Sequence, residues 1–235
     1  MNLAIIAAGE SSRLKAEGLK TSKSMIRVNG ECLIERIIRI ARHHGANRTV
    51  CIINRREPEL REFLASADFG MPLKLLVKDT TSSMHSLFAL APFLTEAPFC
   101  LAATDSVFRE TEFAGFISFS LRQKNLDGVL AVTSFIDDEK PLCVSLDDEK
   151  RILAFSDSPE GAGWATGGIY YLSPRIFDLM EKARQKGISR LRNYFKVLVS
   201  EGYVFKGFAF SKIIDLDRPS DIREAERFLS HEDRG

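Results

Sequence analysis

The chain has 235 residues, 45% of them hydrophobic, and its 33 basic and 32 acidic residues leave a net charge of +1. This length suits one large α/β domain or two small ones, and the balanced charge gives no reason to expect a nucleic acid as partner. No apolar stretch approaches the roughly 20 residues of a membrane-spanning helix, and the apolar start lacks the basic residues of a signal peptide. We therefore expect a soluble, cytoplasmic protein that binds neither nucleic acid nor membrane.

Strands and helices alternate through the first half of the chain. Short apolar runs bounded by glycine or polar residues predict strands buried on both faces, at residues 3–8, 49–53, 72–77, 99–103 and 128–133. Apolar residues at helical spacing predict helices at residues 32–44, 57–65, 83–93 and 113–123. Residues 9–30 are expected to form a polar loop. This order of elements indicates βαβ units and a mostly parallel sheet.

The second half of the chain does not continue the regular alternation of strands and helices. Two short segments at 142–146 and 151–155 flank a polar run and predict a β-hairpin. Further strands are predicted at 167–172, 203–210 and 213–216, and further helices at 174–186, 191–200 and 219–229. Because no repeat or flexible linker interrupts the chain, we expect a single domain over residues 1–235 with a mixed second half.

The cysteines predict neither a metal site nor a disulfide. Cys32, Cys51, Cys100 and Cys143 form no C-x-x-C pair, and each lies among apolar residues. This setting is typical of small side chains buried in a core, so we expect four buried thiols.

The first predicted strand leads into a loop of small residues. The loop runs through Ala7, Ala8, Gly9, Glu10, Ser11 and Ser12, and Arg13 and Lys23 follow. Open α/β folds bind ligands at this edge of the sheet, where small residues let backbone N–H groups approach a phosphate. Arg13 could grip a phosphate through two hydrogen bonds, and Lys23 would add positive charge. Taken alone, the loop is explained equally well as an ordinary strand-to-helix connection.

The longer stretch resembles the N-terminal signature of nucleotidyltransferases of the sugar-nucleotide pyrophosphorylase superfamily, in its MobA-like single-domain form. That signature reads roughly A-A-G-x-G-[ST]-R-[LM], then P-K-x-[LM], then G-[KR]-P-[LM]-[IL]. The matching residues are Gly9, Ser12, Arg13, Lys23 and Gly30. Ser11 stands where the family has a second glycine, and Ser22 replaces the proline before the lysine, so the base preference cannot be transferred. The resemblance implies a Rossmann-like, GT-A-like α/β fold, with helices on both faces of a mostly parallel mixed sheet.

Two acidic segments extend the resemblance. Asp105 ends the predicted strand at 99–103, like the family's G-D-x-x-[FL] aspartate that binds Mg²⁺; capping of the next helix is the alternative. Asp215 and Asp217 lie in a segment similar to the family's D-[IV]-D-T-P-E-D-L, in which one acidic residue completes the metal site. We favour Asp217 for that role. Asp221 falls in the first turn of the last helix, where a structural role suits a carboxylate.

Two further segments correspond to the family's substrate-binding positions. Ser82 and Ser83 occupy the place of a small-residue motif near the base and ribose, although a serine N-cap explains them equally well. His85, one turn later, is expected to be structural. The strand at 167–172 resembles the one that borders the second substrate's pocket, so Thr166, Gly167 and Trp164 are candidate acceptor-binding residues. Surface packing is the alternative for Trp164.

The resemblance implies attack by a substrate phosphate oxygen on the α-phosphorus of an NTP, with release of pyrophosphate. Residues 1–135 would bind the nucleotide, and residues 136–235 a phosphorylated acceptor such as a sugar 1-phosphate or phosphocholine. Arg13 and Lys23 would hold the phosphates, and the aspartates would hold Mg²⁺. Two alternatives are a catalytically impaired nucleotide-binding relative and a glycosyltransferase of the GT-A type. A dinucleotide-dependent oxidoreductase fits poorly, because the first loop lacks G-x-G-x-x-G.

Overall fold

A computed structural model describes residues 1–8, 21–137, 140–158, 160 and 163–230. Its central strand is β1 (Asn2–Ala7), which pairs in parallel with β4 (Arg48–Ile53) and β6 (Phe99–Ala103), and β5 (Leu73–Val77) extends the sheet beyond β4. These strands are the continuous apolar runs of the sequence. β1, β4 and β6 tolerate burial on both faces because they carry almost no polar side chain, whereas the edge strand β5 is only partly buried. The predicted parallel core of the sheet is confirmed.

Antiparallel pairing enters with the second half of the chain. The long strand β11 (Trp164–Leu172) pairs antiparallel with both β6 and β8 (Gly128–Thr133), and β12 (Phe205–Phe210) lies parallel to β8. The predicted hairpin is present as β9 (Cys143–Leu146) and β10 (Ile152–Ser156), attached to the start of β11. Within the described residues, the result is a mixed sheet of nine strands.

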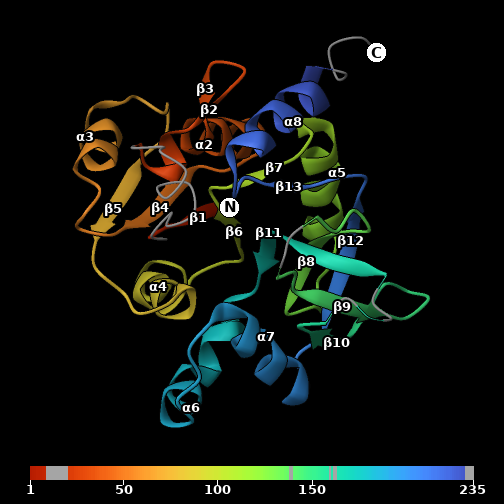
Figure 1. Ribbon diagram of the computed structural model, residues 1–235. Coiled ribbons are helices and arrows are strands. Elements are labelled where there is room, and N and C mark those ends of the chain that lie inside the picture. The colour runs from red at the N-terminus through yellow and green to blue at the C-terminus, as the bar shows by residue number, and fades with distance from the viewer. Residues whose placement is uncertain (9–20, 138–139, 159, 161–162, 231–235) are drawn as a thin grey trace.

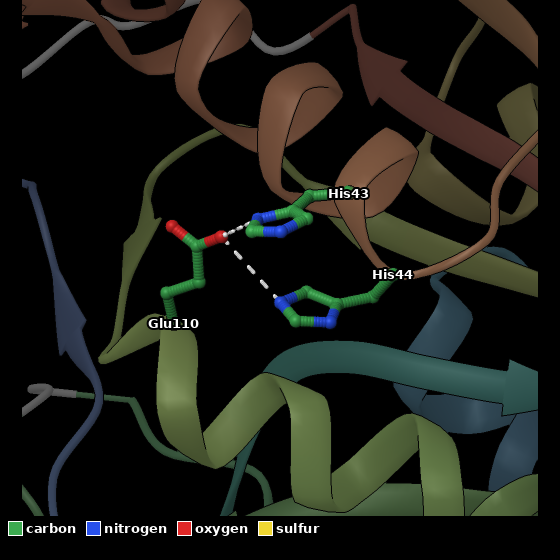
Figure 2. A group of neighbouring side chains, drawn as sticks. All are labelled: His43, His44 and Glu110. Atoms are coloured by element: carbon green, nitrogen blue, oxygen red, sulfur yellow. Dashed lines mark hydrogen bonds and ion pairs between the residues drawn. The ribbon is translucent and has the colours of Figure 1, made fainter.

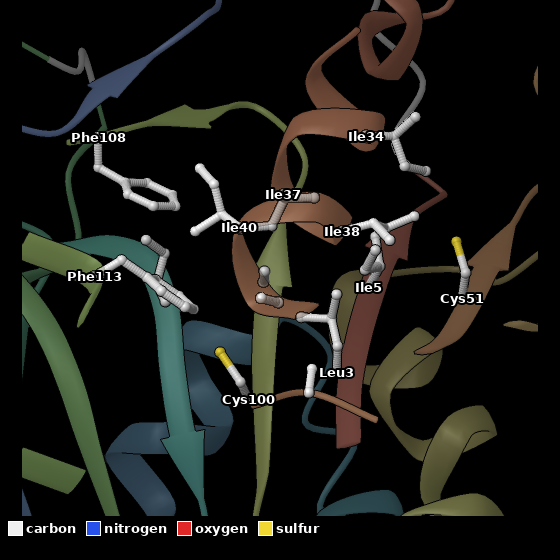
Figure 3. Packing of buried hydrophobic residues seen from close by; sticks show 14 of the residues in the cluster. Leu3, Ile5, Ile34, Ile37, Ile38, Ile40, Cys51, Cys100, Phe108 and Phe113 are labelled. Atoms are coloured by element: carbon white, nitrogen blue, oxygen red, sulfur yellow. The ribbon is translucent and has the colours of Figure 1, made fainter. Parts of the chain in front are cut away.

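Helices cover both faces of this sheet, as expected (Figure 1). One face is packed by α2 (Leu33–His43), α3 (Pro58–Ser66) and α5 (Glu110–Leu121), whose apolar residues meet Leu3 and Ile5 (Figure 3). The other face is packed by α4 (Ser83–Leu90), α6 (Met180–Gln185) and α7 (Leu191–Ser200), which meet Ala4. Successive residues of β1 thus enter opposite cores, because side chains alternate along a strand.

A smaller cluster lies beyond the end of β6. Helix α8 (Pro219–Ser230) packs there against two short strand pairs, β2 (Arg27–Val28) with β3 (Glu31–Cys32), and β7 (Ser106–Val107) with β13 (Ile214–Asp215). Of these strands, only the segment around β13 was predicted. The β2–β3 hairpin lies partly in the stretch expected to be loop. Its Asn29-Gly30 turn, with φ of 50° and 83°, suits a two-residue hairpin.

Two predicted helices are interrupted. Residues 83–93 form α4 followed by a 3₁₀ turn, Ala91–Phe93, which contains Pro92. Residues 174–186 form a 3₁₀ helix, Pro174–Leu179, and then α6. Proline at the start of a helix fixes φ but lacks an N–H, which favours such short turns. No helix in the described part of the chain is long and apolar enough to cross a membrane.

Candidate active site

Three aspartates surround one lysine at the carboxyl edge of the sheet. The Lys23 ammonium lies 2.7 Å from Asp105 Oδ2, 2.7 Å from Asp217 Oδ1 and 3.3 Å from Asp215 Oδ1. Lys23 and Asp217 are 194 residues apart in the sequence, so only the fold brings them together. The convergence expected of Lys23 and the aspartates is therefore present.

Short backbone contacts hold the aspartates in place. Only Thr104 separates Asp105 from the end of β6, and the Asp105 carbonyl oxygen accepts a hydrogen bond from the Leu216 N–H at 3.0 Å. The next residue, Ser106, pairs with Asp215 in the β7–β13 ladder. Asp105 does not cap the next helix, because α5 has Arg109 at its N-cap. The capping alternative for Asp105 is therefore wrong.

Lys23 is positioned by a short 3₁₀ helix, Lys23–Met25, that is tied to the strand end. The buried Ser24 hydroxyl lies 2.9 Å from that of Thr104, the residue just before Asp105. Ser22, which replaces the family's proline, precedes the helix with φ of −52° and ψ of 138°. Proline fixes φ near −65°, so the serine adopts nearly the conformation that proline would impose. The departure at Ser22 leaves this backbone intact.

The Lys23 side chain is only 14% exposed, which makes its charge state dependent on its partners. Burial opposes the ammonium charge, but Asp105 and Asp215 attract it and Asp105 and Asp217 accept its hydrogen bonds, so its pKa is raised above the ordinary lysine value. Lys23 is therefore a fixed positive charge at neutral pH. It cannot serve as a general base.

A cavity of about 460 Å³ opens beside the aspartates. Asp105, Asp215 and Asp217 line one side of it, and Thr166 and Gly167 of β11 line another. Apolar side chains form much of the remaining wall: Phe135, Ile136, Pro141, Leu142, Leu191, Phe195 and Ile213. The chamber therefore joins a charged end to an apolar wall, as small-molecule sites do.

The other predicted site residues that the structure describes do not all line the cavity. Trp164 is not among the described residues that line the cavity, and its ring lies 4.9 Å from the Lys150 ammonium. An acceptor-binding role for Trp164 stays a prediction. Ala7 ends β1 and Ala8 follows it, whereas Gly9, Glu10, Ser11, Ser12 and Arg13 lie outside the described residues.

The two serines at the start of α4 have structural partners. Ser82 is the N-cap of α4, where its hydroxyl accepts from the His85 N–H and lies 2.9 Å from His85 Nδ1. Ser83 accepts the Leu191 N–H at 3.2 Å, yet it also borders the cavity. The capping alternative for Ser82 and the structural interpretation of His85 both agree with this geometry. Nucleotide contact by either serine stays a prediction.

Asp221 has the structural role expected of it. Its Oδ2 accepts the backbone N–H groups of Asp217 at 2.9 Å and Arg218 at 2.7 Å. The carboxylate thereby satisfies N–H groups at the start of α8 and fixes the backbone of Asp217.

Sequence reasoning missed several residues at this site. In the sequence, Thr104 stands out only because it occupies the place of the glycine in the family's G-D-x-x-[FL] motif. No sequence pattern identifies Ser24 as its hydrogen-bond partner. Arg192 lines the cavity from the first turn of α7, donating to Asp157 Oδ1 at 2.9 Å and to the Lys140 carbonyl at 2.7 Å. No local pattern around Arg192 indicates that it faces a cavity, because this depends on how α7 packs.

The aspartate cluster has the chemistry of a magnesium site. Carboxylate oxygens are the protein ligands that Mg²⁺ prefers, and here three of them already surround a cationic group beside a cavity. Asp105 Oδ2 and Asp217 Oδ1 each lie 2.7 Å from the Lys23 nitrogen, so both carboxylates face the same region. These residues fit the metal that the family resemblance implies.

Comparison with known proteins shows which proteins this chain resembles. The model of the MobA-like NTP transferase domain matches residues 3–193. The bifunctional protein GlmU of Methanocaldococcus jannaschii is 25% identical over 97% of this chain and 54% of its own length. A bifunctional IPC transferase and DIPP synthase of Aquifex aeolicus is 23% identical over 96% of this chain and 51% of its own length. The chain thus spans about half the length of these curated relatives.

A solved structure gives the same fold. The inositol-1-phosphate CTP transferase from T. maritima superimposes with a TM-score of 0.83 at 19% identity, covering 100% of this chain and 96% of that one. Since the family model covers most of the chain, the protein belongs to the MobA-like NTP transferase family of nucleotidyltransferases.

Proposed function

We propose that the chain is a Mg²⁺-dependent nucleotidyltransferase that joins a nucleoside monophosphate to a phosphorylated small molecule and releases pyrophosphate. The observation that carries this proposal is the meeting of Lys23, Asp105 and Asp217 beside a cavity large enough for a small ligand. Family membership adds support.

The residues would act by position and charge. A phosphate oxygen is already a competent nucleophile, so the reaction needs no general base, and none is needed from Lys23. Lys23 would neutralise charge on the α-phosphate, and Arg13 would hold the leaving phosphates. Asp105 and Asp217 would hold Mg²⁺, whose positive charge would stabilise the negative charge that develops on the phosphates.

We propose a sugar or polyol phosphate as the acceptor. The T. maritima structure is named for inositol 1-phosphate. In this chain, Thr166 brings a hydroxyl group and Arg192 a cation to the same cavity. The base of the NTP is left to the experiment.

A pyrophosphate-release assay tests the proposal. Each common NTP would be combined with inositol 1-phosphate, glucose 1-phosphate and phosphocholine, with Mg²⁺ and with EDTA. Lys23→Ala and Asp105→Asn should each lower kcat about 10²–10³-fold, as loss of one electrostatic group does. Lys124→Ala and Asp148→Asn, which change exposed side chains that do not line the cavity, serve as matched controls.

Two outcomes would contradict the proposal. Wild-type turnover in both Lys23→Ala and Asp105→Asn would remove the assigned roles. NTP binding by calorimetry without turnover on any acceptor would instead indicate a binding protein on the same fold.

A further inference from the structure

A second cluster of chemically active side chains lies outside the active site. His43 is the last residue of α2, His44 follows as its C-cap, and Glu110 is the first residue of α5 (Figure 2). None of the three lines the cavity beside the aspartates. The cluster joins two helices that pack on the same face of the sheet.

The two imidazoles converge on one carboxylate oxygen. His43 Nδ1 lies 2.8 Å from Glu110 Oε1, and His44 Nε2 lies 3.4 Å from the same oxygen, as the dashed lines in Figure 2 show. The three ligand atoms all lie within 4.8 Å of one another. The rings are stacked, with centroids 4.9 Å apart and planes inclined by 23°. One small ion could therefore be reached by all three groups.

His44 supplies an independent sign that a ligand is needed. Its Nε2 is buried, yet it makes no hydrogen bond with any group in the described part of the chain. The His44 ring also contacts Phe113, 5.9 Å between centroids, so its orientation is restrained. The 3.4 Å contact with Glu110 Oε1 does not satisfy this buried nitrogen as a hydrogen bond, and a metal ion would.

Arg39 prepares the carboxylate without occupying the shared oxygen. Its Nη1 lies 2.9 Å from Glu110 Oε2, and the same guanidinium pairs with Glu31. Groups that orient a metal ligand in this way are a regular part of metal sites.

We propose that His43, His44 and Glu110 form a binding site for Zn²⁺ or a similar first-row transition ion. Two imidazole nitrogens and one carboxylate oxygen are a donor set that Zn²⁺ accepts, whereas Mg²⁺ and Ca²⁺ prefer oxygen ligands throughout. His43 is largely exposed, so water can complete the coordination. The ion would tie the end of α2 to the start of α5, independently of the transferase reaction.

Zn²⁺ titration of the full chain tests this site. The protein would be stripped with EDTA, dialysed into excess Mg²⁺ to occupy the sites built only from carboxylates, and titrated against a chromogenic chelator. We expect one tightly bound Zn²⁺ per chain. His43→Gln and Glu110→Gln should each weaken Zn²⁺ binding at least tenfold, whereas His85→Gln, in α4, should not.

A second readout separates this site from the buried cysteines. The described thiols are all buried, so Co²⁺ substituted for Zn²⁺ should show no thiolate charge-transfer band. Zn²⁺ should raise the thermal midpoint of the wild type and leave that of His43→Gln unchanged, while circular dichroism verifies that both are folded. Equal Zn²⁺ affinity in wild type and the His43→Gln/Glu110→Gln double variant would overturn the proposal, whatever the transferase assay shows.

Discussion

The three aspartates around Lys23 are not equivalent, and their differences predict which of them holds Mg²⁺. Asp217 is 2.7 Å from the ammonium and 30% exposed, whereas Asp215 is 3.3 Å away and 42% exposed. Asp217 also has its backbone fixed by Asp221. A ligand that is held in place loses less freedom on binding an ion, so Asp217 is the better partner for Asp105.

Mg²⁺ titration of the initial rate distinguishes the two aspartates. We expect Asp217→Asn to raise the Mg²⁺ concentration needed for half-maximal rate at least tenfold. Asp215→Asn should change it less, since that carboxylate is farther from the lysine and more exposed. The reverse order would assign the second ligand to Asp215.

Gly167 predicts a steric effect at the cavity wall. A Cβ atom at this position would lie 2.1 Å from Ile213 Cδ1 and 3.1 Å from Ile213 Cβ, and a β-branched side chain has few alternative rotamers. Gly167→Ala should therefore destabilise the fold by about 1–3 kcal/mol and raise the KM for the acceptor. Gly163→Ala is the control, because its Cβ would meet no atom of the described residues within 4 Å. Urea unfolding and steady-state kinetics measure both effects, and equal stability of the two variants would refute the steric argument.

At the scale of elements, Asp221 couples the start of α8 to the active site. The same carboxylate oxygen accepts the N–H groups of Arg218 and Asp217. Asp221→Ala should cost about 0.5–2 kcal/mol, as loss of a helix cap does, and should also lower kcat by releasing the Asp217 backbone. Glu59→Ala is the control, because Glu59 lies in the first turn of α3 and no side chain caps that helix. Urea unfolding and pyrophosphate release are the measurements. Equal losses of stability and kcat in Asp221→Ala and Glu59→Ala would mean that Asp221 acts only through the helix dipole and does not fix the Asp217 backbone.

The elements also show what a sequence can and cannot predict. The strands around β1 were predicted closely because each is a continuous apolar run, a signal that is local. The β2–β3 hairpin was missed although its Asn29-Gly30 turn is a strong local signal, because strands as short as Arg27–Val28 and Glu31–Cys32 contain no apolar run. The Ser24–Thr104 bond and the place of Arg192 could not be predicted, since both depend on segments that meet only after folding.

At the scale of the whole molecule, the parallel strands carry the site to one edge. Asp105 lies just beyond the end of β6, which pairs with the central strand β1. The pairing of β13 with β7 brings the late segment with Asp215 and Asp217 to the same place. The second half supplies the opposite wall through β11 and α7. The cavity therefore needs both halves of the sheet, and the division into a nucleotide-binding half and an acceptor-binding half stays a prediction.

Two buried thiols make the free energy of unfolding of the whole sheet depend on pH. Cys51 in β4 and Cys100 in β6 flank the central strand, both are fully buried, and burial raises the pKa of each thiol to about 12. An unfolded thiol ionises near pH 8.5. As the pH rises between these values, only the unfolded chain gains the ionised form. The stabilising contribution is therefore complete below about pH 8.5 and is lost as the pH approaches 12.

We accordingly expect the free energy of unfolding to fall with rising pH across this window, by up to about 1.4 kcal/mol per pH unit for each thiol. Urea unfolding of the wild type and of a Cys51→Ala/Cys100→Ala variant at several alkaline pH values gives the difference that belongs to the two thiols, since other titrating groups contribute equally to both proteins. The variant should have the shallower dependence on pH. Identical slopes, or rapid reaction of the native protein's Cys51 and Cys100 with a thiol reagent, would show that the sheet opens locally without unfolding as a unit.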